Sequence, residues 1–241
     1  KSNRVKKIII AELQNVCKKF GKPRRSEIIY NAEIVETELE TPVSNEPVHL
    51  FISQQGYFKK ITPQSLRMSS EQKFKEGDSL FASYDTTNDV ELLFFSNRQQ
   101  VYKAKADDFE FSKASVLGDF VPSKLDMEAD EAFSYMAVTK DYSGYMIFFF
   151  ENGKVAKVDM ASYATKTNRK KLIKAYSDKS PLVAAMYIQQ DIELVLVSSA
   201  GRHLLFNTGS VSAKTTKDTQ GVAVLTLKKG QRLMTVRPYV E

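Results

Sequence analysis

The sequence predicts an all-β, propeller-like array of about four blades, preceded by one N-terminal α-helix. Four stretches share one pattern: an apolar strand, a short polar turn, and a second strand that carries basic residues. They begin near residues 48, 90, 145 and 192, so the intervals are 42, 55 and 47 residues, the length of one four-stranded blade. Because a lone hairpin cannot bury its apolar face, the copies must pack side by side.

The first 27 residues read as a separate segment. Val5, Ile8, Leu13 and Val16 follow a helical spacing, which predicts a helix over residues 3–20. Gly21 and the following proline end it. We expect an extended entry strand over residues 26–39 and a linker over residues 41–47. The predicted domains are therefore a helical and basic junction at 1–27 and the array at 28–241.

Turn chemistry marks the register inside each repeat. Asn152-Gly153 is the strongest hairpin signal, because both turn residues must tolerate positive φ. Gly56 and Gly201 mark weaker versions, whereas the second copy has Gln99 and lacks the glycine. A further strand is expected after each hairpin, at residues 80–84, 133–139, 182–188 and 221–227. The polar loops at 65–77, 104–130, 161–181 and 211–220 are the expected binding surface.

Charge is distributed unevenly along the chain. The net charge is +6, but residues 1–27 hold nine basic and two acidic residues, which leaves −1 for the remainder. Residues 28–89 and 90–144 are acidic, whereas residues 145–191 and 192–241 are basic. A chain polarised in this way presents a positive flank to a polyanion.

Composition also suggests a cellular setting. Cys17 is the sole cysteine, which excludes an internal disulfide framework and favours a cytoplasmic protein. No apolar run approaches the roughly 20 residues that cross a bilayer. Since the chain starts at a lysine and lacks a signal-peptide pattern, we expect it to be part of a longer protein.

Motifs of catalysis and metal binding are absent from the sequence. It contains no phosphate-binding GxxxxGK[ST], no GxSxG and no HExxH. We interpret His49 and His203 as structural residues. The acidic cluster from Asp126 to Glu131 lacks the spacing of a calcium loop and is read as a solvated loop. We therefore predict no catalytic residue, no metal site and no cofactor in this chain.

Two motifs carry a family resemblance. The segment Lys19-Phe20-Gly21-Lys22-Pro23-Arg24-Arg25-Ser26-Glu27-Ile28 resembles the end of the tower coiled coil in A subunits of bacterial type IIA topoisomerases, DNA gyrase and topoisomerase IV. That family has the motif (K)YGDxRRTEI there, just before its C-terminal domain. The strand Gln55-Gly56-Tyr57-Phe58-Lys59-Lys60-Ile61 is similar to the family's first-blade strand.

The resemblance implies a β-pinwheel, in which neighbouring blades exchange strands and the outer rim binds and bends duplex DNA. It implies that residues 1–27 are the tail of the coiled-coil helix. It also implies that the cleavage tyrosine and magnesium site lie upstream or on a partner subunit, so none of the eleven tyrosines should be catalytic. The parent enzyme would be an A2B2 heterotetramer that uses ATP and magnesium on other domains or subunits.

One departure from the family concerns the gyrase box. DNA gyrase A subunits carry QRRGGKG after the first-blade strand, whereas residues 64–78 contain no paired arginines and no double glycine. This favours an A subunit of the topoisomerase IV type. Four visible repeats, fewer than the five or six usual in these domains, also argue against a closed ring.

Basic residues recur on or beside the repeated hairpins. Residues spaced around a rim can neutralise DNA phosphates and release counterions without reading base sequence. The predicted DNA-binding residues are Lys59, Lys60, Arg98, Lys103, Lys105, Lys154, Lys157, Arg169, Lys170, Lys171, Arg202, Lys228 and Lys229. By contrast, Phe94, Phe95 and residues 148–150 lie in continuous apolar strands and are predicted core, which argues against a single-strand binder.

These observations give one main hypothesis and two alternatives. The main one is a non-catalytic domain that binds and bends double-stranded DNA without sequence preference and presents the transported duplex to the cleavage gate for ATP-dependent strand passage. The acidic first half leaves open a protein-interaction propeller with no nucleic-acid role. An enzyme in the central channel would need converging titratable groups, and the repeated strands supply mainly apolar ones.

Overall fold

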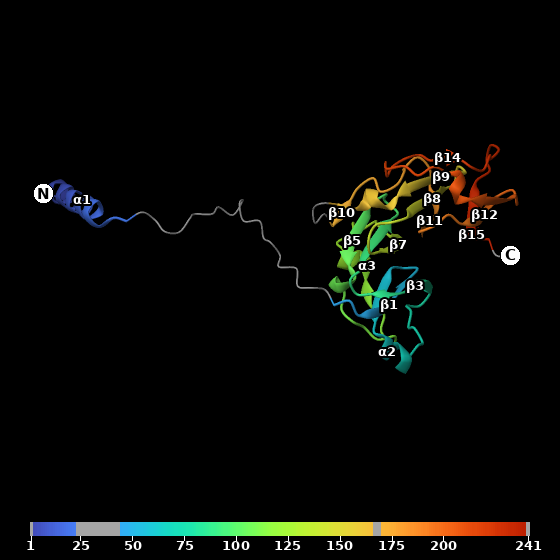
Figure 1. Cartoon of the computed structure of the whole chain (residues 1–241), viewed down its shortest axis with the longest axis horizontal. Helices are drawn as coiled ribbons and strands as arrows, with labels where there is room; N and C mark the ends of the chain where they lie inside the picture. The colour runs from blue at the N-terminus through green and yellow to red at the C-terminus, as the bar shows by residue number, and fades with distance from the viewer. Residues whose placement is uncertain (1, 23–43, 166–169, 240–241) are drawn as a thin grey trace. The chain divides into compact units, whose positions relative to one another are not determined.

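The computed structural model describes residues 2–22, 44–165 and 170–239 (Figure 1). The chain divides into two units, Lys1–Thr41 and Pro42–Glu241. The predicted domain boundary at residue 27 and the expected entry strand at 26–39 lie outside the described residues.

Helix α1 (Ser2–Phe20) confirms the predicted N-terminal helix. Lys18 and Lys19 occupy its last turn, where cations complement the helix dipole. Gly21 N donates to Cys17 O at 2.8 Å, and a Cβ on Gly21 would lie only 2.3 Å from that oxygen. Apolar side chains such as Ile8 and Leu13 are exposed along the helix. No helix in the described part of the chain has the length and apolar character to span a membrane.

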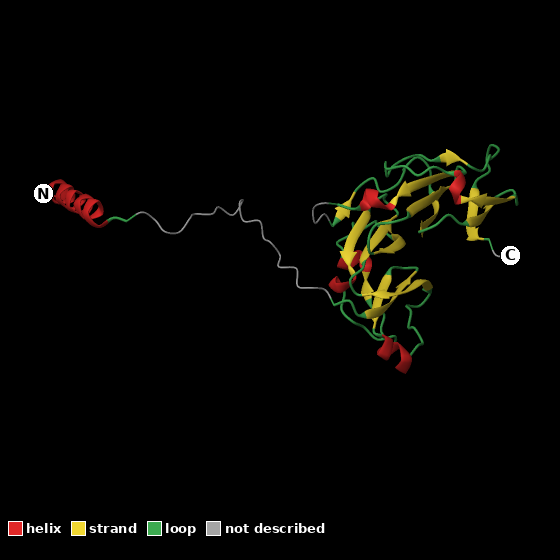
Figure 2. Ribbon diagram, in the orientation of Figure 1, coloured by secondary structure: helices red, strands yellow, loops and turns green. Residues whose placement is uncertain are grey.

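The described residues of the second unit form four antiparallel sheets, one for each repeat (Figures 1 and 2). The first sheet has the order β3 (Leu80–Thr87), β1 (Pro47–Ser53), β2 (Tyr57–Ile61), β6 (Asp119–Phe120). The second has the order β10 (Lys171–Leu172), β5 (Val101–Lys105), β4 (Glu91–Ser96), β7 (Phe133–Thr139). The third has the order β11 (Leu182–Ile188), β8 (Tyr145–Phe150), β9 (Lys154–Asp159), β14 (Val222–Ala223). The fourth has the order β13 (His203–Asn207), β12 (Glu193–Ser198), β15 (Leu233–Pro238).

Neighbouring sheets exchange strands, which confirms the predicted propeller-like pinwheel. Strand β6 follows the second hairpin in sequence but pairs with β2 of the first sheet, through Tyr57 and Phe120. In the same way β10 pairs with β5, and β14 pairs with β9. We call residues 106–132, 160–181 and 208–232 the first, second and third exchanged segments. Each one covers the outer edge of the preceding sheet.

The opposite edges of the sheets face inward. Strands β3, β7, β11 and β15 form these inner edges, and β11 contacts both β7 and β15. Short helices lie in the connections: α2 (Pro63–Met68), α3 (Val121–Lys124), and the 3₁₀ turns η1 (Ala106–Asp108), η2 (Met160–Tyr163) and η3 (Thr208–Ser210).

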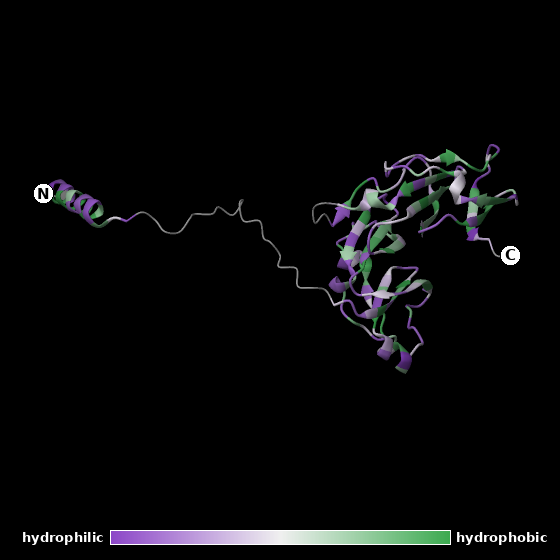
Figure 3. Cartoon of the chain, viewed as in Figure 1, coloured by the Kyte–Doolittle hydropathy of each residue, from purple (hydrophilic) through white to green (hydrophobic). Residues whose placement is uncertain are grey.

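Three hydrophobic clusters hold the sheets together in series. Phe58 and Phe94 belong to a cluster shared by the first two sheets. Phe95 and Phe148 pack between the second and third sheets, and Phe149 and Phe206 between the third and fourth. Hydrophobic residues accordingly concentrate in the strands (Figure 3). The predicted core phenylalanines are 0–1% exposed. None of these three clusters of described residues joins the fourth sheet to the first.

The four hairpin turns share one backbone conformation. Gly56, Gln99, Gly153 and Gly201 occupy equivalent positions, with φ values of 88°, 54°, 77° and 73°. Left-handed φ favours glycine, so the turn signals in the first, third and fourth repeats are confirmed. Gln99 adopts the same conformation although its side chain makes it unfavourable.

One predicted strand is wrong. Residues 221–227 were expected to complete the fourth sheet, but β15 does so, with Val195 opposite Arg237. Gly221 instead packs so closely on β9 that a Cβ there would lie 2.3 Å from Val155 O. The adjoining β14 then pairs with the third sheet. A contact with a distant strand, which the local apolar pattern does not encode, decides the pairing.

Candidate nucleic-acid interface

Two of the predicted DNA-binding residues, Lys59 and Lys60, are buried in the first sheet, 3% and 2% exposed. Lys59 Nζ donates to Lys73 O at 2.8 Å and Ala114 O at 3.0 Å. Lys60 Nζ donates to Asn88 Oδ1 at 2.8 Å and to Ala106 O at 2.9 Å. Burial lowers the pKa of both ammonium groups. Their hydrogen bonds to the protein remove them from the candidate interface.

Lys157 repeats the arrangement of Lys60 two blades later. It is 5% exposed, and its Nζ lies 2.6 Å from Asp191 Oδ1 and 3.4 Å from Thr208 O. Thr208 opens η3 as Ala106 opens η1, so both lysines reach a 3₁₀ turn of the next repeat. Lys157 is therefore also removed from the interface.

Lys103 holds the equivalent position in the second repeat and is partly covered. Its Nζ lies 3.6 Å from Glu91 Oε2 and 4.9 Å from the centre of the Tyr142 ring, and it donates to Thr165. The fourth repeat has Leu205 at this position, 54% exposed. The recurring lysine of the sequence pattern therefore serves contacts between repeats.

Most other predicted residues lie on the surface. Lys154 is half-buried, and the exposed members are Arg98, Lys105, Lys170, Lys171, Arg202, Lys228 and Lys229. Arg169 lies outside the described residues. Arg202 Nη1 donates to Thr226 O at 3.2 Å, which ties the fourth hairpin to the third exchanged segment.

The acidic cluster binds two of these exposed cations. Glu128 lies 3.1 Å from Lys171 Nζ, and Asp130 pairs with Arg98. Glu131 is buried, 6% exposed, and accepts hydrogen bonds from Ser96 and Tyr102. These hydrogen bonds lower its pKa although burial alone would raise it. Part of the predicted solvated loop is thus anchored on the second hairpin.

The exchanged segments differ sharply in charge. The first contains two basic and eight acidic residues, a balance of −6. The second contains six basic and one acidic residue, or +5, and the third contains five and one, or +4. Strands β3, β7 and β11 of the inner edge contain no lysine or arginine. Positive charge is therefore concentrated at the outer edges of the second and third sheets.

The structure adds basic residues that the hairpin pattern missed. They lie on the same two exchanged segments and are exposed: Lys174, Lys179, Lys214 and Arg232. A charge count over each connection would have found them, because they lie between the hairpins rather than on them.

Two buried tyrosines, Tyr163 and Tyr176, are engaged in structural hydrogen bonds. Tyr163 Oη donates to Ala175 O at 2.7 Å, and Tyr176 Oη donates to Ser96 O at 2.6 Å. Burial raises the pKa of Tyr163 well above its ordinary value and that of Tyr176 to about 12. A nucleophilic hydroxyl needs the opposite shift. Tyr176 thus fixes the second exchanged segment to the second sheet, whereas Tyr163 makes a hydrogen bond within that segment.

The two histidines differ. His49 Nδ1 lies 2.5 Å from Asp85 Oδ1 on the neighbouring strand, in keeping with a structural role. His203 is exposed on β13, so its apolar sequence neighbours did not indicate its surroundings. No group of three or more described His, Cys, Asp or Glu residues could hold a metal ion.

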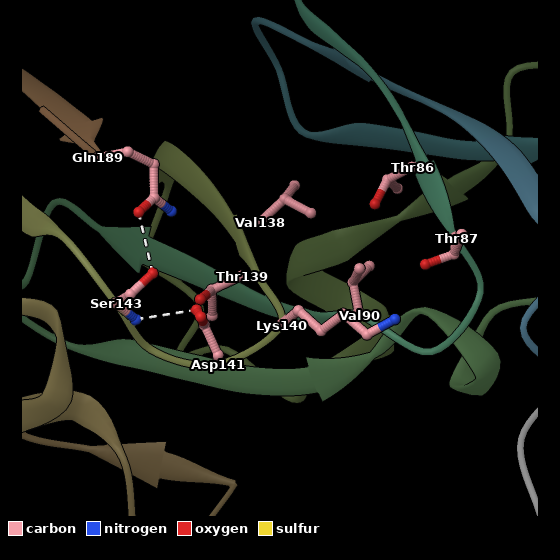
Figure 4. Close-up of a pocket in the computed structure, with 9 residues that line it drawn as sticks. All are labelled: Thr86, Thr87, Val90, Val138, Thr139, Lys140, Asp141, Ser143 and Gln189. Carbon is pink, nitrogen blue, oxygen red and sulfur yellow. Dashed lines mark hydrogen bonds between the residues drawn. The ribbon is translucent and has the colours of Figure 1, made fainter.

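A polar pocket lies near the inner edges (Figure 4). Val90, Val138 and Thr139 form part of its wall, and Ser143 donates to Gln189 Oε1 at 2.9 Å. Lys140, another wall residue, lies 2.6 Å from Asp89 and lowers the pKa of that carboxyl. The charged wall residues are Lys140 and Asp141, which offers little for acid–base catalysis.

Part of the chain matches a known family model, and the chain resembles topoisomerase subunits along most of its length. Residues 193–239 match the family model described as DNA gyrase C-terminal domain, beta-propeller. Similar proteins include the DNA gyrase A subunit of Borreliella burgdorferi, 22% identical over 97% of this chain, and the DNA topoisomerase 4 A subunit of Staphylococcus aureus, 25% identical over 85%. The chain spans 30% and 26% of their lengths.

Solved structures share the fold. The C-terminal domain of DNA topoisomerase IV superimposes with a TM-score of 0.71 at 23% identity, covering 83% of this chain and 63% of the other. The E. coli ParC C-terminal domain gives 0.61 at 15% identity, covering 79% and 78%. The strand exchange and these superpositions show that the chain shares the propeller-like fold of these C-terminal domains, and residues 193–239 also match the family model of the DNA gyrase C-terminal domain.

Proposed function

We propose that this domain binds and bends double-stranded DNA without sequence preference and presents the transported duplex to the cleavage gate of its parent topoisomerase. The domain performs no chemical step itself. Its task is to hold a duplex where strand passage, driven by ATP elsewhere in the enzyme, can use it.

The positive charge of the second and third exchanged segments is the main observation that supports this proposal. The second and third exchanged segments have net charges of +5 and +4. They cover the outer edges of the second and third sheets, which are neighbours in the series. DNA carries one negative charge per roughly 1.7 Å of helix axis, so a continuous basic edge neutralises several phosphates and releases their counterions. Contacts to phosphates position a duplex but do not read its sequence.

Bending follows from the arrangement of the basic residues. Lys170 lies on the second exchanged segment, whereas Lys228 and Lys229 lie on the third, and the two segments cover successive sheets that differ in direction. A duplex that contacts both must curve, and DNA bending of this kind costs about 1–6 kcal/mol, offset by the added phosphate contacts.

The proposal extends to the parent protein. We place the domain in a cytoplasmic A2B2 heterotetramer, in which the cleavage tyrosine, the magnesium ions and the ATPase belong to other domains or subunits. The lone Cys17 agrees with a reducing compartment.

Gel-shift titration with a mixed-sequence duplex at several salt concentrations tests the proposal. We expect binding that weakens steeply with salt and does not depend on base sequence. Replacing Arg169, Lys170 and Lys171 together with Ala should weaken binding and lower the log–log salt slope by about 0.9 for each lost phosphate contact. The matched control replaces Arg67, Lys73 and Lys75, which removes the same charge from the loop after the first hairpin.

Two results would count against the proposal. Absence of salt-sensitive binding by the unaltered chain would favour the alternative of a protein-interaction propeller. Equal losses in the triple variant and its control would mean that net charge, rather than the second exchanged segment, governs binding.

A further inference from the structure

A groove lies where three successive repeats meet. Arg98 and Gln99 come from the second hairpin turn, Lys174 and Lys179 from the second exchanged segment, and Gln220 from the third. Gln100 and Ile173 also contribute to its wall. The groove thus belongs to the two basic segments and to the turn that lies beside them.

Two residues of this groove have unfavourable backbone conformations. Gln99 and Lys174 both have φ of 54°, and Ala175 N donates to Gln99 O at 2.8 Å, which links the two. The other three repeats place glycine at the position of Gln99. A side chain is therefore present here where glycine would be less strained, and such outliers often mark functional positions.

The groove wall is held rigidly. Tyr163 donates to Ala175 O and Tyr176 donates to Ser96 O, and Leu172 and Ala175 are buried. Ile173 remains 66% exposed between the two buried residues. Lys174 is therefore presented from a fixed backbone.

The chemistry of the groove fits a sugar–phosphate backbone. It offers one guanidinium, two ammonium groups and the amides of Gln99, Gln100 and Gln220 as hydrogen-bond donors. Two carboxylates oppose them: Asp178, which lies 3.5 Å from Lys179, and Asp218. Arg98 pairs with Asp130, but both partners are more than half exposed. Exposed ion pairs of this kind are weak enough for a phosphate to displace them.

We propose that this groove binds the sugar–phosphate backbone of duplex DNA and that Gln99 is present for this contact rather than for the turn. The proposal rests on the DNA-binding function proposed above. It adds a defined contact point at the junction of the second, third and fourth repeats.

The first experiment measures duplex binding by the full chain with Lys174→Gln and Lys179→Gln combined. We expect a loss of about tenfold in affinity and a log–log salt slope lower by about 1–2. The control, Lys73→Gln with Lys75→Gln, changes net charge equally and should have a smaller effect on both quantities.

The second experiment uses Gln99→Gly, which relieves the backbone strain and removes the amide. We expect a melting temperature higher by about 2 °C or more, together with a several-fold loss of DNA affinity. A residue with only a structural role would give the higher melting temperature with unchanged binding.

The outcomes separate the two proposals. If the unaltered chain fails to bind the duplex, the proposed function fails. If it binds and the groove variants match their controls, the groove assignment is overturned while the function stands.

Discussion

Lys157 and Asp191 join the third repeat to the fourth, with Lys157 Nζ 2.6 Å from Asp191 Oδ1 and Asp191 also accepting from Thr208. These hydrogen bonds, from Lys157 first and then Thr208, lower the pKa of Asp191. A carboxyl whose folded pKa is depressed adds stability above its unfolded pKa of about 3.9 and loses it as pH falls through the folded value.

We therefore predict that Asp191→Asn lowers the free energy of unfolding at pH 7 and that this difference from the unaltered chain shrinks as pH falls below about 4. Urea denaturation at pH 7, 4 and 3 provides the measurement. A difference that stays constant over this range would mean that the ionised carboxylate does not stabilise the junction.

Lys60→Met should destabilise the domain without a direct effect on DNA binding. Removing the buried ammonium leaves Asn88 Oδ1 and Ala106 O without their donor, at a cost of about 1–3 kcal/mol. Denaturation gives the stability change, and a salt titration of DNA binding under folded conditions should give an unchanged slope. A reduced salt slope would show that Lys60 contributes to DNA binding.

Glu128 and Asp130 should compete with DNA for Lys171 and Arg98. The variant Glu128→Gln with Asp130→Asn frees both cations, and since exposed pairs are worth about 0.2–1 kcal/mol each, affinity should rise about two- to thirtyfold. The salt slope should also steepen. Glu71→Gln with Glu76→Gln removes the same charge from a distant loop and serves as the control; an equal gain there would refute the competition.

Gly153→Ala should cost more stability than Gly201→Ala. Both residues have left-handed φ, 77° and 73°, so both substitutions strain the turn. Only Gly153 also meets a close neighbour, since its Cβ would lie 2.3 Å from Leu225 O of the third exchanged segment. Comparison of the two melting temperatures checks this. Equal losses would indicate that the segment moves aside without cost.

Local pattern was sufficient for much of the fold. The apolar runs placed β7 and β11 at their observed bounds, because period and length are properties of neighbouring residues. The turn glycines fixed the hairpins for the same reason. Strand exchange came only through the family resemblance, since nothing local tells β14 to pair with β9 rather than β12.

The candidate site was less predictable from the sequence than the fold. From sequence, Lys60, Lys105 and Lys157 are alike: each is a basic residue on or near a repeated hairpin. The sequence alone determined the four-fold repeat, its turns, its core and the basic character of its second half. Only the tertiary structure decided which lysines face solvent, because the next repeat covers one face of each hairpin and supplies carbonyl and carboxylate oxygens to Lys60 and Lys157. The groove around Gln99 likewise exists only once three repeats have packed together.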